Sequence, residues 1–424
     1  MNNRSPIREG STLLNDLELC NLIEPLSGDQ GNIAVRLARS IWSRVSEPGD
    51  ALAGSLIATL GVLPALDFLM SSSSGHDIVQ NLPSCDREPL QPSQLTSALQ
   101  RWRPRLDRVA TMDDLRIATT LGMRLLVPED PDWPEALNDL GAHTPHMLWV
   151  RGEPRLLSQP SLAVVGARAC TGYGSQITAE LTGDACAAGF SVVSGAAYGV
   201  DAVAHRTALA VEAPTIAVLA GGADRPYPAS HDQLISRIAE LGAVCSELVP
   251  GTAPTRWRFL QRNRLIAALS RAILVTEAGT RSGTLNTAGH GAEIGRPLGA
   301  VPGPITSAAS AGCHRLIREY GASLITNGTE LLDLLGTNSD ALFGRDLLEI
   351  DSDGEFNRQP SVHVRILDAL PLRGGRELSK VAKHAGITQQ EARETLTELE
   401  LLGHVEQRVN TSGGTVLWAL TRNE

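Results

Sequence analysis

Residues 161–174 read SLAVVGARACTGYG, and this stretch decides how the middle of the chain folds. An apolar run of strand length ends in Gly166-Ala167-Arg168, and two more glycines, Gly172 and Gly174, precede a segment with helical spacing. A strand that leads into a glycine turn and then a helix is typical of the first unit of a parallel α/β sheet. We therefore expect this turn to lie at the carboxyl edge of such a sheet.

The same alternation of short apolar runs and helical segments continues to about residue 301. We expect strands at residues 162–165, 191–193, 215–219, 243–246, 272–276 and 298–301. We expect helices between them at residues 175–188, 202–211, 230–241, 261–270 and 284–294. This order predicts an α/β fold, a Rossmann-like doubly wound and mostly parallel sheet with helices on both faces. Its ligands should bind at the carboxyl ends of the strands.

The sequence predicts further domains on both sides of this sheet domain, which spans residues 126–336. Residues 1–125 carry apolar side chains at helical spacing and predict an N-terminal helical domain. Residues 337–360 form an acidic linker, and residues 361–424 predict three short helices and a hairpin, the order of a winged helix. The helix expected at residues 388–402 holds four glutamates against Arg393 alone, which favours binding to protein over binding to duplex DNA.

Composition limits what the chain can bind. Its formal net charge of -10 excludes a general attraction to nucleic acid or anionic membrane, so any such binding must be local. The six cysteines are scattered without metal-ligand spacing, which fits reduced thiols in the cytoplasm. No signal peptide is apparent, and glycine, proline and aspartate interrupt the most apolar stretch, residues 51–70. We expect a cytoplasmic protein with no metal ion, no cofactor and no membrane partner.

Glycine and hydroxyl residues follow four of the expected strands. Their backbone N–H groups can approach an anion at a helix N-terminus, and an arginine can add a bidentate phosphate contact. We expect an extended phosphate-binding rim built from Gly166, Arg168, Gly172, Gly174, Ser194, Gly195, Gly199, Gly221, Gly222, Ser282, Gly283 and Thr284. A dinucleotide fingerprint and a P-loop are both excluded, because the second expected strand ends without an acid and the first turn contains no lysine.

Residues 255–264, TRWRFLQRNR, hold four arginines, two aromatic residues and no acid. Guanidinium groups bind phosphates, and aromatic faces stack on unpaired bases at roughly 1 to 3 kcal/mol per base. The alternative is that Trp257 and Phe259 anchor the core while some arginines pair with glutamates at strand ends. Within one helix, Arg262 and Arg264 would point about 200° apart, so one of the two can be structural.

Four acids lie at or just after the expected strand ends, namely Asp201, Asp224, Glu247 and Glu277. Two-metal chemistry needs closely grouped carboxylates, and these four acids form no local ligand motif such as D-x-D. We favour helix caps and arginine partners as the role of these acids. His205, four residues after Asp201, is expected to be structural rather than a general base.

Several of these motifs, taken in order, resemble the DNA-processing protein A (DprA, also called Smf) family. They are VVGAR at 164–168, SGAAYGVD at 194–201, AGG at 220–222, RNR at 262–264, RSGT at 281–284 and VPG at 301–303. The resemblance covers about residues 133–335. Ala167 stands where the family commonly has serine, which removes one hydroxyl from the turn. The resemblance implies an extended Rossmann fold that binds single-stranded DNA and helps to load the recombinase RecA during natural transformation.

By this resemblance the DNA contacts are Arg168, Arg262, Asn263 and Arg264, together with Phe259 and Arg281 of the same motifs. The leading hypothesis is a non-enzymatic, sequence-independent single-strand binder and recombination mediator, with RecA as its partner and a homodimer left open. The rival is a nucleotide-binding or nucleotide-hydrolysing Rossmann-like enzyme with its ligand at the same turns. The PGG-x-GT pattern of phosphoribohydrolase relatives is absent here, which disfavours the enzyme.

Overall fold

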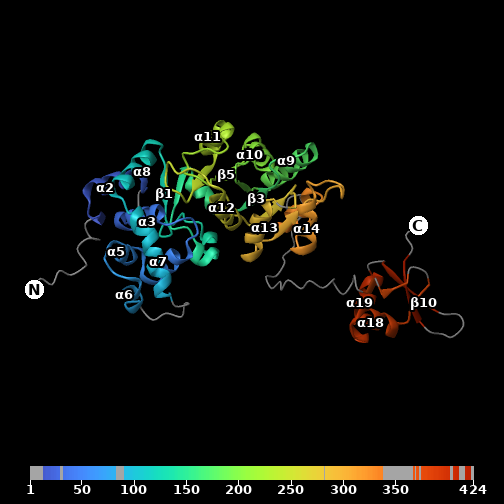
Figure 1. Cartoon of the computed structure of the whole chain (residues 1–424). Helices are drawn as coiled ribbons and strands as arrows, with labels where there is room; N and C mark the ends of the chain where they lie inside the picture. Colours follow the sequence, from blue (N-terminus) through green and yellow to red (C-terminus); the bar gives the residue numbers. More distant parts are fainter. Residues whose placement is uncertain are drawn as a thin grey trace, which may run out of the picture. The chain divides into compact units, whose positions relative to one another are not determined.

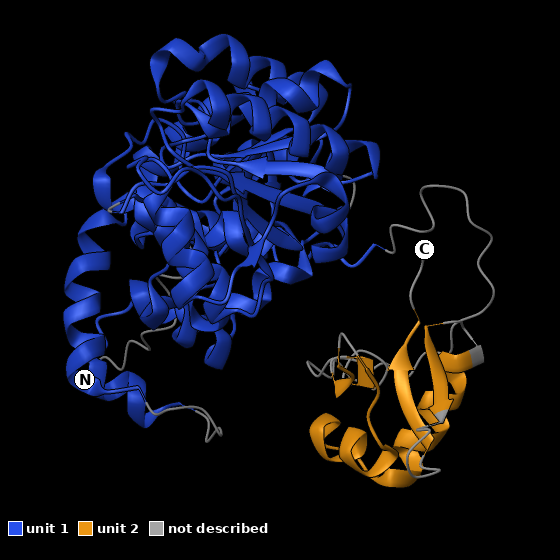
Figure 2. Cartoon of the chain, turned by 90° about the vertical axis from the view of Figure 1, so that its right-hand side faces the viewer, with its two compact units in different colours: residues 1–346 blue, residues 347–424 orange. Residues whose placement is uncertain are grey.

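The computed structural model describes residues 13–28, 32–82, 90–280, 282–337, 366–367, 369–371, 374–401, 404–409 and 416–421. The chain divides into two compact units, residues 1–346 and residues 347–424, which are coloured separately in Figure 2. The first unit contains the large sheet and the N-terminal helices (Figure 1). Each unit is described by itself below.

The first unit is built on a nine-stranded sheet in the order β1-β2-β6-β5-β4-β3-β7-β8-β9. The six strands expected from the sequence are confirmed, with ends that shift by one residue at most: β3 (Ser161–Val165), β4 (Ser191–Ser194), β5 (Thr215–Val218), β6 (Ala243–Ser246), β7 (Ala272–Val275) and β8 (Leu298–Ala300). They are parallel to one another, as is the short edge strand β9 (Ser323–Leu324). Two antiparallel strands, β1 (Arg124–Leu126) and β2 (Leu148–Gly152), extend the other edge.

Helices cover both faces of this sheet, which confirms the doubly wound fold. The side chains of β3 alternate between two cores: Leu162 packs in one cluster with Leu181, and Ala163 packs in another with Ile266. Strands that are buried on both faces read as continuous apolar runs, as these do. The helices of this part are α9 (Gly172–Ala187), α10 (Val200–Ala210), α11 (Asp232–Leu241), α12 (Arg256–Leu269), α13 (Thr284–Glu293), α14 (Ala311–Glu319) and α15 (Gly328–Leu334).

The direction in which the chain adds strands to the sheet changes at β3. From β3 the chain adds β4, β5 and β6 on one side, and α12 then carries it back to β7 on the other side. At such a switch point the loops at the carboxyl ends diverge and leave a crevice. Helix α12 begins at Arg256 rather than at residue 261 as expected, because the Thr255 hydroxyl caps it by accepting from the Arg258 N–H at 3.3 Å. The basic strip is therefore helical almost from its start.

The N-terminal part is helical, as expected. It contains α2 (Leu17–Ile23), α3 (Ile33–Val45), α4 (Ala51–Leu60), α5 (Val62–Met70), α6 (Gly75–Gln80), α7 (Pro92–Trp102) and α8 (Arg108–Thr120). Trp42 and Trp102 meet edge to face in its core, with ring centroids 5.2 Å apart. Among the described residues, no single helix is long and apolar enough to cross a membrane; α4 and α5 meet that criterion only together, across a bend of 115°. Short 3-10 helices complete the unit at Glu24–Leu26, Arg103–Arg105, Glu135–His143, Pro154–Ser158 and Ala229–His231.

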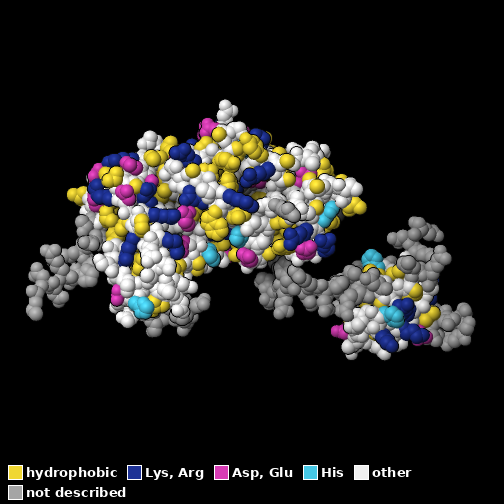
Figure 3. All heavy atoms as spheres, in the orientation of Figure 1, with side chains coloured by type: hydrophobic (Ala, Val, Ile, Leu, Met, Phe, Trp, Pro, Cys, Tyr) yellow, Lys and Arg dark blue, Asp and Glu magenta, His cyan; other side chains and the backbone are white. Residues whose placement is uncertain are grey.

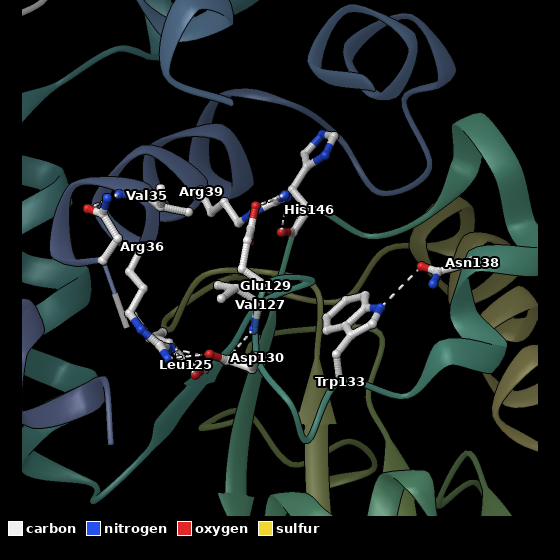
Figure 4. A network of polar contacts seen from close by, with 11 residues as sticks. Val35, Arg36, Arg39, Leu125, Val127, Glu129, Asp130, Trp133, Asn138 and His146 are labelled. Carbon is white, nitrogen blue, oxygen red and sulfur yellow. Dashed lines mark hydrogen bonds and ion pairs between the residues drawn. The ribbon is translucent and has the colours of Figure 1, made fainter. Parts of the chain in front are cut away.

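Two buried arginines of α3 fasten these helices to the edge of the sheet (Figure 4). Arg36 donates to the Leu125 carbonyl at 2.9 Å and pairs with Asp130. Arg39 holds Glu129 through two contacts of 2.6 Å and donates to the His146 carbonyl at 2.9 Å. Paired, multiply bonded arginines of this kind fix geometry between elements. The N-terminal helices and the sheet consequently form one compact unit.

The second unit contains α18 (Leu378–Ala385), α19 (Gln389–Leu401) and the antiparallel strands β10 (Val405–Val409) and β11 (Val416–Leu420). Its core gathers Ile366, Leu396 and Trp418. The elements agree with the expected helices and hairpin, but most of the first helix and the hairpin turn lie outside the described residues. The winged helix therefore stays a prediction. The acidic linker also lies outside the described residues, except for Thr337.

Candidate functional site

A cavity of about 870 Å³ opens at the carboxyl edge of the sheet, between the β3 turn, α12 and the start of α13. Eight of the expected site residues line it: Gly166, Arg168, Phe259, Arg262, Asn263, Ser282, Gly283 and Thr284. Arg256, from the basic strip at residues 255–264, also lines it, whereas the sequence interpretation did not assign Tyr227, Asn286 or Thr287 to the site. On the face drawn in Figure 3, Lys and Arg side chains gather near the centre of the first unit beside a hydrophobic surface.

Arg168 lies on the open rim of this cavity. Its side chain is exposed, and its guanidinium carbon stands 5.3 Å from the centre of the Phe259 ring. No described carboxylate forms an ion pair with it. The turn that carries it depends on Gly166, where a Cβ atom would come within 2.5 Å of Val200. Gly166 therefore permits close packing, and Arg168 is a positive charge that a ligand can reach.

Arg262 lies on the cavity wall but is buried, with 6% of its surface exposed. Its Nη1 donates to the Gly195 carbonyl at 2.9 Å and to the Val218 carbonyl. Burial lowers the pKa of its guanidinium to about 10, against the opposing effect of the Asp201 charge. Arg262 thus keeps its charge at neutral pH while also linking the ends of two strands.

Arg264 points to a different part of the molecule. Its side chain is 3% exposed, forms a 2.8 Å ion pair with Glu247 and donates to the His143 carbonyl at 3.0 Å. It does not line the cavity, so its position does not fit the phosphate contact that we expected. The alternative, an arginine paired with a glutamate at a strand end, is confirmed for this residue.

The structure also shows the positions of the two aromatic residues of the basic strip and of Asn263. Trp257 is 57% exposed, so it is not a core anchor, whereas Phe259 is half-buried on the cavity wall. The amide of Asn263 donates to Asn286 Oδ1 at 3.2 Å. This bond joins α12 to α13, and both residues line the cavity.

The turn after β3 already binds a carboxylate of the same chain. The Glu277 carboxylate accepts from the Thr171 N–H at 2.9 Å and from the Thr171 hydroxyl at 2.6 Å. A Cβ atom on Gly174 would come within 2.2 Å of Glu277 Oε2, so the glycine makes room for this carboxylate. Gly172 and Gly174 do not line the cavity. The phosphate site expected at the start of α9 is therefore occupied by protein.

Donors of the next two turns also have acceptors within the protein, and in the turn after β5 the Gly222 N–H donates to the Thr252 carbonyl at 2.9 Å. Asp201 accepts from the Gly195 N–H at 3.2 Å and the Ala197 N–H at 3.3 Å, and Asp224 accepts from the Gly251 N–H at 2.8 Å. Ser194, Gly195, Gly199, Gly221 and Gly222 do not line the cavity, although Ala197 and Asp201 of the β4 turn do. The extended rim is therefore not formed as expected, because only Gly166, Arg168, Ser282, Gly283 and Thr284 of its residues line the cavity. The favoured role of the acids, as caps and partners, is confirmed.

The fourth turn does reach the cavity. The Thr284 hydroxyl donates to the Gly166 carbonyl at 3.0 Å and accepts from the Ser282 hydroxyl at 2.8 Å, which holds this turn against the β3 turn. Arg281 lies outside the described residues. Across the part of the chain that the structure describes, no three His, Cys, Asp or Glu side chains are grouped to hold a metal ion. The site is thus a basic, aromatic and hydroxyl-lined cavity.

Comparisons with known proteins agree with this arrangement. The family described as DNA recombination-mediator protein A matches residues 124–336. A putative DNA processing protein DprA of Mycobacterium tuberculosis is 39% identical over 381 residues, covering 86% of this chain and 91% of that protein. The DNA processing protein DprA of Bacillus subtilis is 32% identical over 256 residues, covering 60% of this chain and 84% of that protein.

The X-ray structure of DNA processing protein A from Streptococcus pneumoniae has the same fold. It matches with a TM-score of 0.56 and 28% sequence identity, over 70% of this chain and 95% of that one. The family match spans the whole sheet and every described residue of the cavity. The chain therefore belongs to the DNA recombination-mediator protein A family, the DprA/Smf proteins.

Proposed function

We propose that this chain binds single-stranded DNA in the cavity at the carboxyl edge of the sheet, without reading its sequence. The observation that carries the proposal is the local charge. Three arginines line the cavity, Arg168, Arg256 and Arg262, and the single acid among the lining residues is Asp201. Because three arginines outnumber this one acid, the cavity is basic in a chain whose net charge is -10.

The shape and composition of the site suit an unpaired strand. Arginines bind phosphates, and the rings of Tyr227 and Phe259 offer apolar surface next to them, with centroids 5.2 Å apart. A duplex hides its bases in the stack and offers such rings nothing to contact. Single strands should therefore bind more tightly than duplex of the same length.

The binding experiment is a fluorescence anisotropy titration with a labelled single strand, the matching duplex and mononucleotides, at two salt concentrations. We expect the single strand to bind best, with affinity falling by about 0.7 log units per log unit of salt for each phosphate neutralised. Equal binding of the duplex would refute the preference. A flat salt response would show that the arginines do not contact the strand.

We propose further that the bound strand is passed to the RecA recombinase, so that the chain acts as a recombination mediator rather than an enzyme. The family description supports a role as a recombination mediator. Among the described residues, the acids at the strand ends are not grouped in a way that could hold a metal ion for hydrolysis. A nucleotide-hydrolysing enzyme is the competing proposal, since the cavity has room for a nucleotide. Release of base or phosphate from mononucleotides by the purified protein would favour that enzyme.

The second unit is proposed to bind protein. Helix α19 carries Glu391, Glu394, Glu398 and Glu400, and phosphates would be repelled by this surface. Deleting residues 362–424 should leave single-strand affinity within about threefold while changing partner binding or self-association. A loss of more than about tenfold, roughly 1.4 kcal/mol, in a truncated protein that still melts cooperatively would identify the unit as a DNA contact.

A further inference from the structure

Two partly exposed tyrosines lie at the cavity, one on its wall and one beside a lining residue. Tyr198 follows β4 and is 50% exposed; Tyr227 follows β5 and is 47% exposed. They lie in the loops of adjacent parallel strands, at the same edge of the sheet. A tyrosine combines an apolar ring with a polar hydroxyl and is enriched at binding interfaces.

The structure holds both rings in place. The Tyr198 hydroxyl is 2.7 Å from the Ser230 hydroxyl, and its ring packs edge to face on His231, with centroids 4.8 Å apart. Tyr227 lies three residues before Ser230 in the same loop and packs against Phe259 at 5.2 Å. Rings that are fixed before binding lose little side-chain freedom when a flat ligand covers them.

The tyrosines also lie next to the charges of the site. Tyr227 lines the cavity itself, and Tyr198 follows the lining residue Ala197. The next residue, Gly199, approaches the Arg168 backbone so closely that a Cβ atom there would meet the Arg168 carbonyl at 2.6 Å. Tyr227 also packs on Phe259, whose ring centre is 5.3 Å from the Arg168 guanidinium carbon, so the loops that carry both tyrosines lie close to Arg168.

We propose that Tyr198 and Tyr227 form a stacking platform for two unpaired bases at the rim of the cavity. This inference rests on the proposed single-strand function and adds where the bases go. The platform reads no sequence, because every base has an aromatic face. It contacts bases only, so its contribution disappears when the bases are absent while the arginine contacts remain.

The test compares a thymidine strand with an abasic strand of equal length, which keeps the phosphates and lacks the bases. Wild-type protein should prefer the thymidine strand. Tyr198→Ala and Tyr227→Ala should each weaken thymidine binding by about fivefold to a hundredfold and change abasic binding by less than about twofold. Tyr198→Phe keeps the ring and should retain most of the affinity.

Tyr320 provides the control. It is 39% exposed and caps the end of α14, away from the residues that line the cavity, so Tyr320→Ala should leave both affinities unchanged. Equal losses for thymidine and abasic strands in folded Tyr198 and Tyr227 variants would overturn the platform, as would equal binding of both strands by the wild type. Failure of the wild type to bind either strand would overturn the proposed function as well.

Discussion

Replacing Arg168 by alanine is the sharpest test of the site, because it separates binding from folding. The guanidinium is exposed and forms no ion pair with a described carboxylate, and its one described contact is with the Phe259 ring. An exposed cation–π contact is worth about 0.5 to 1 kcal/mol, so the free energy of unfolding should change by no more than that. Any larger effect on DNA affinity then comes from the lost contact.

A charge-assisted hydrogen bond contributes about 1.5 to 3 kcal/mol. Since Arg168 stands on the open rim rather than inside the cavity, we take the lower part of that range, about 1.5 to 2 kcal/mol. The dissociation constant of Arg168→Ala should rise roughly 10- to 30-fold, and the log–log salt slope should become shallower by about 0.7. Arg168→Lys should restore part of the affinity, because an ammonium keeps the charge but loses the planar fork.

The assay is anisotropy with one labelled single strand, run beside thermal melting of each variant. The matched control is Arg237→Ala, since Arg237 is also exposed but pairs with Glu240 on α11, away from the lining residues. That variant should bind like the wild type. If Arg168→Ala melts normally and keeps both the wild-type affinity and the wild-type salt slope, the strand does not pass over this rim.

Three further predictions concern buried groups. Arg262→Ala should lower both melting temperature and affinity, because it leaves two buried carbonyls without a donor, at about 1 to 3 kcal/mol each, and removes a charge from the cavity; unchanged melting would contradict this. Arg264→Ala should destabilise the fold by about 3 to 5 kcal/mol, because it leaves the buried Glu247 carboxylate without its ion-pair partner. At temperatures where this variant stays folded, it should bind DNA normally. Burial lowers the pKa of His146 and His205 to about 3, so below pH 6.5 the unfolded chain binds more protons than the folded one. The free energy of unfolding should therefore fall by about 1 kcal/mol per imidazole between pH 6.5 and 5.5. Denaturant titrations of His205→Gln should show about half of that total loss.

The central sheet could be predicted from the sequence because its strands are buried on both faces and its helices alternate with them. The residues of β3 are all buried, which is what an unbroken apolar run indicates. The edge strands β1 and β2 gave no such signal, because β1 has only three residues and its partner lies beyond a long 3-10 segment. Their place in the sheet depends on pairing between distant segments.

The basic strip shows the limit of reading residues without their environment. Its composition correctly indicated arginines beside aromatics, and helical geometry correctly indicated that Arg262 and Arg264 face different ways. Which of the two faces the cavity could not be predicted, because that depends on Glu247 lying where α12 crosses the sheet. The missed residue Tyr227 lies in a loop, lines the cavity and packs against Phe259, a contact between segments far apart in the sequence.

The glycine turns give a more general lesson. A glycine turn at a helix N-terminus shows that N–H donors are present, but the sequence does not say what accepts from them. Here Glu277 and Asp201, which themselves follow β7 and β4, fill the turns after β3 and β4. A phosphate placed at the start of α9 would meet the Glu277 carboxylate and be repelled, so negative charge is directed away from that turn and toward Arg168 and α12. If the proposed function holds, the acids at these strand ends should direct phosphates to Arg168 and α12 rather than to the start of α9.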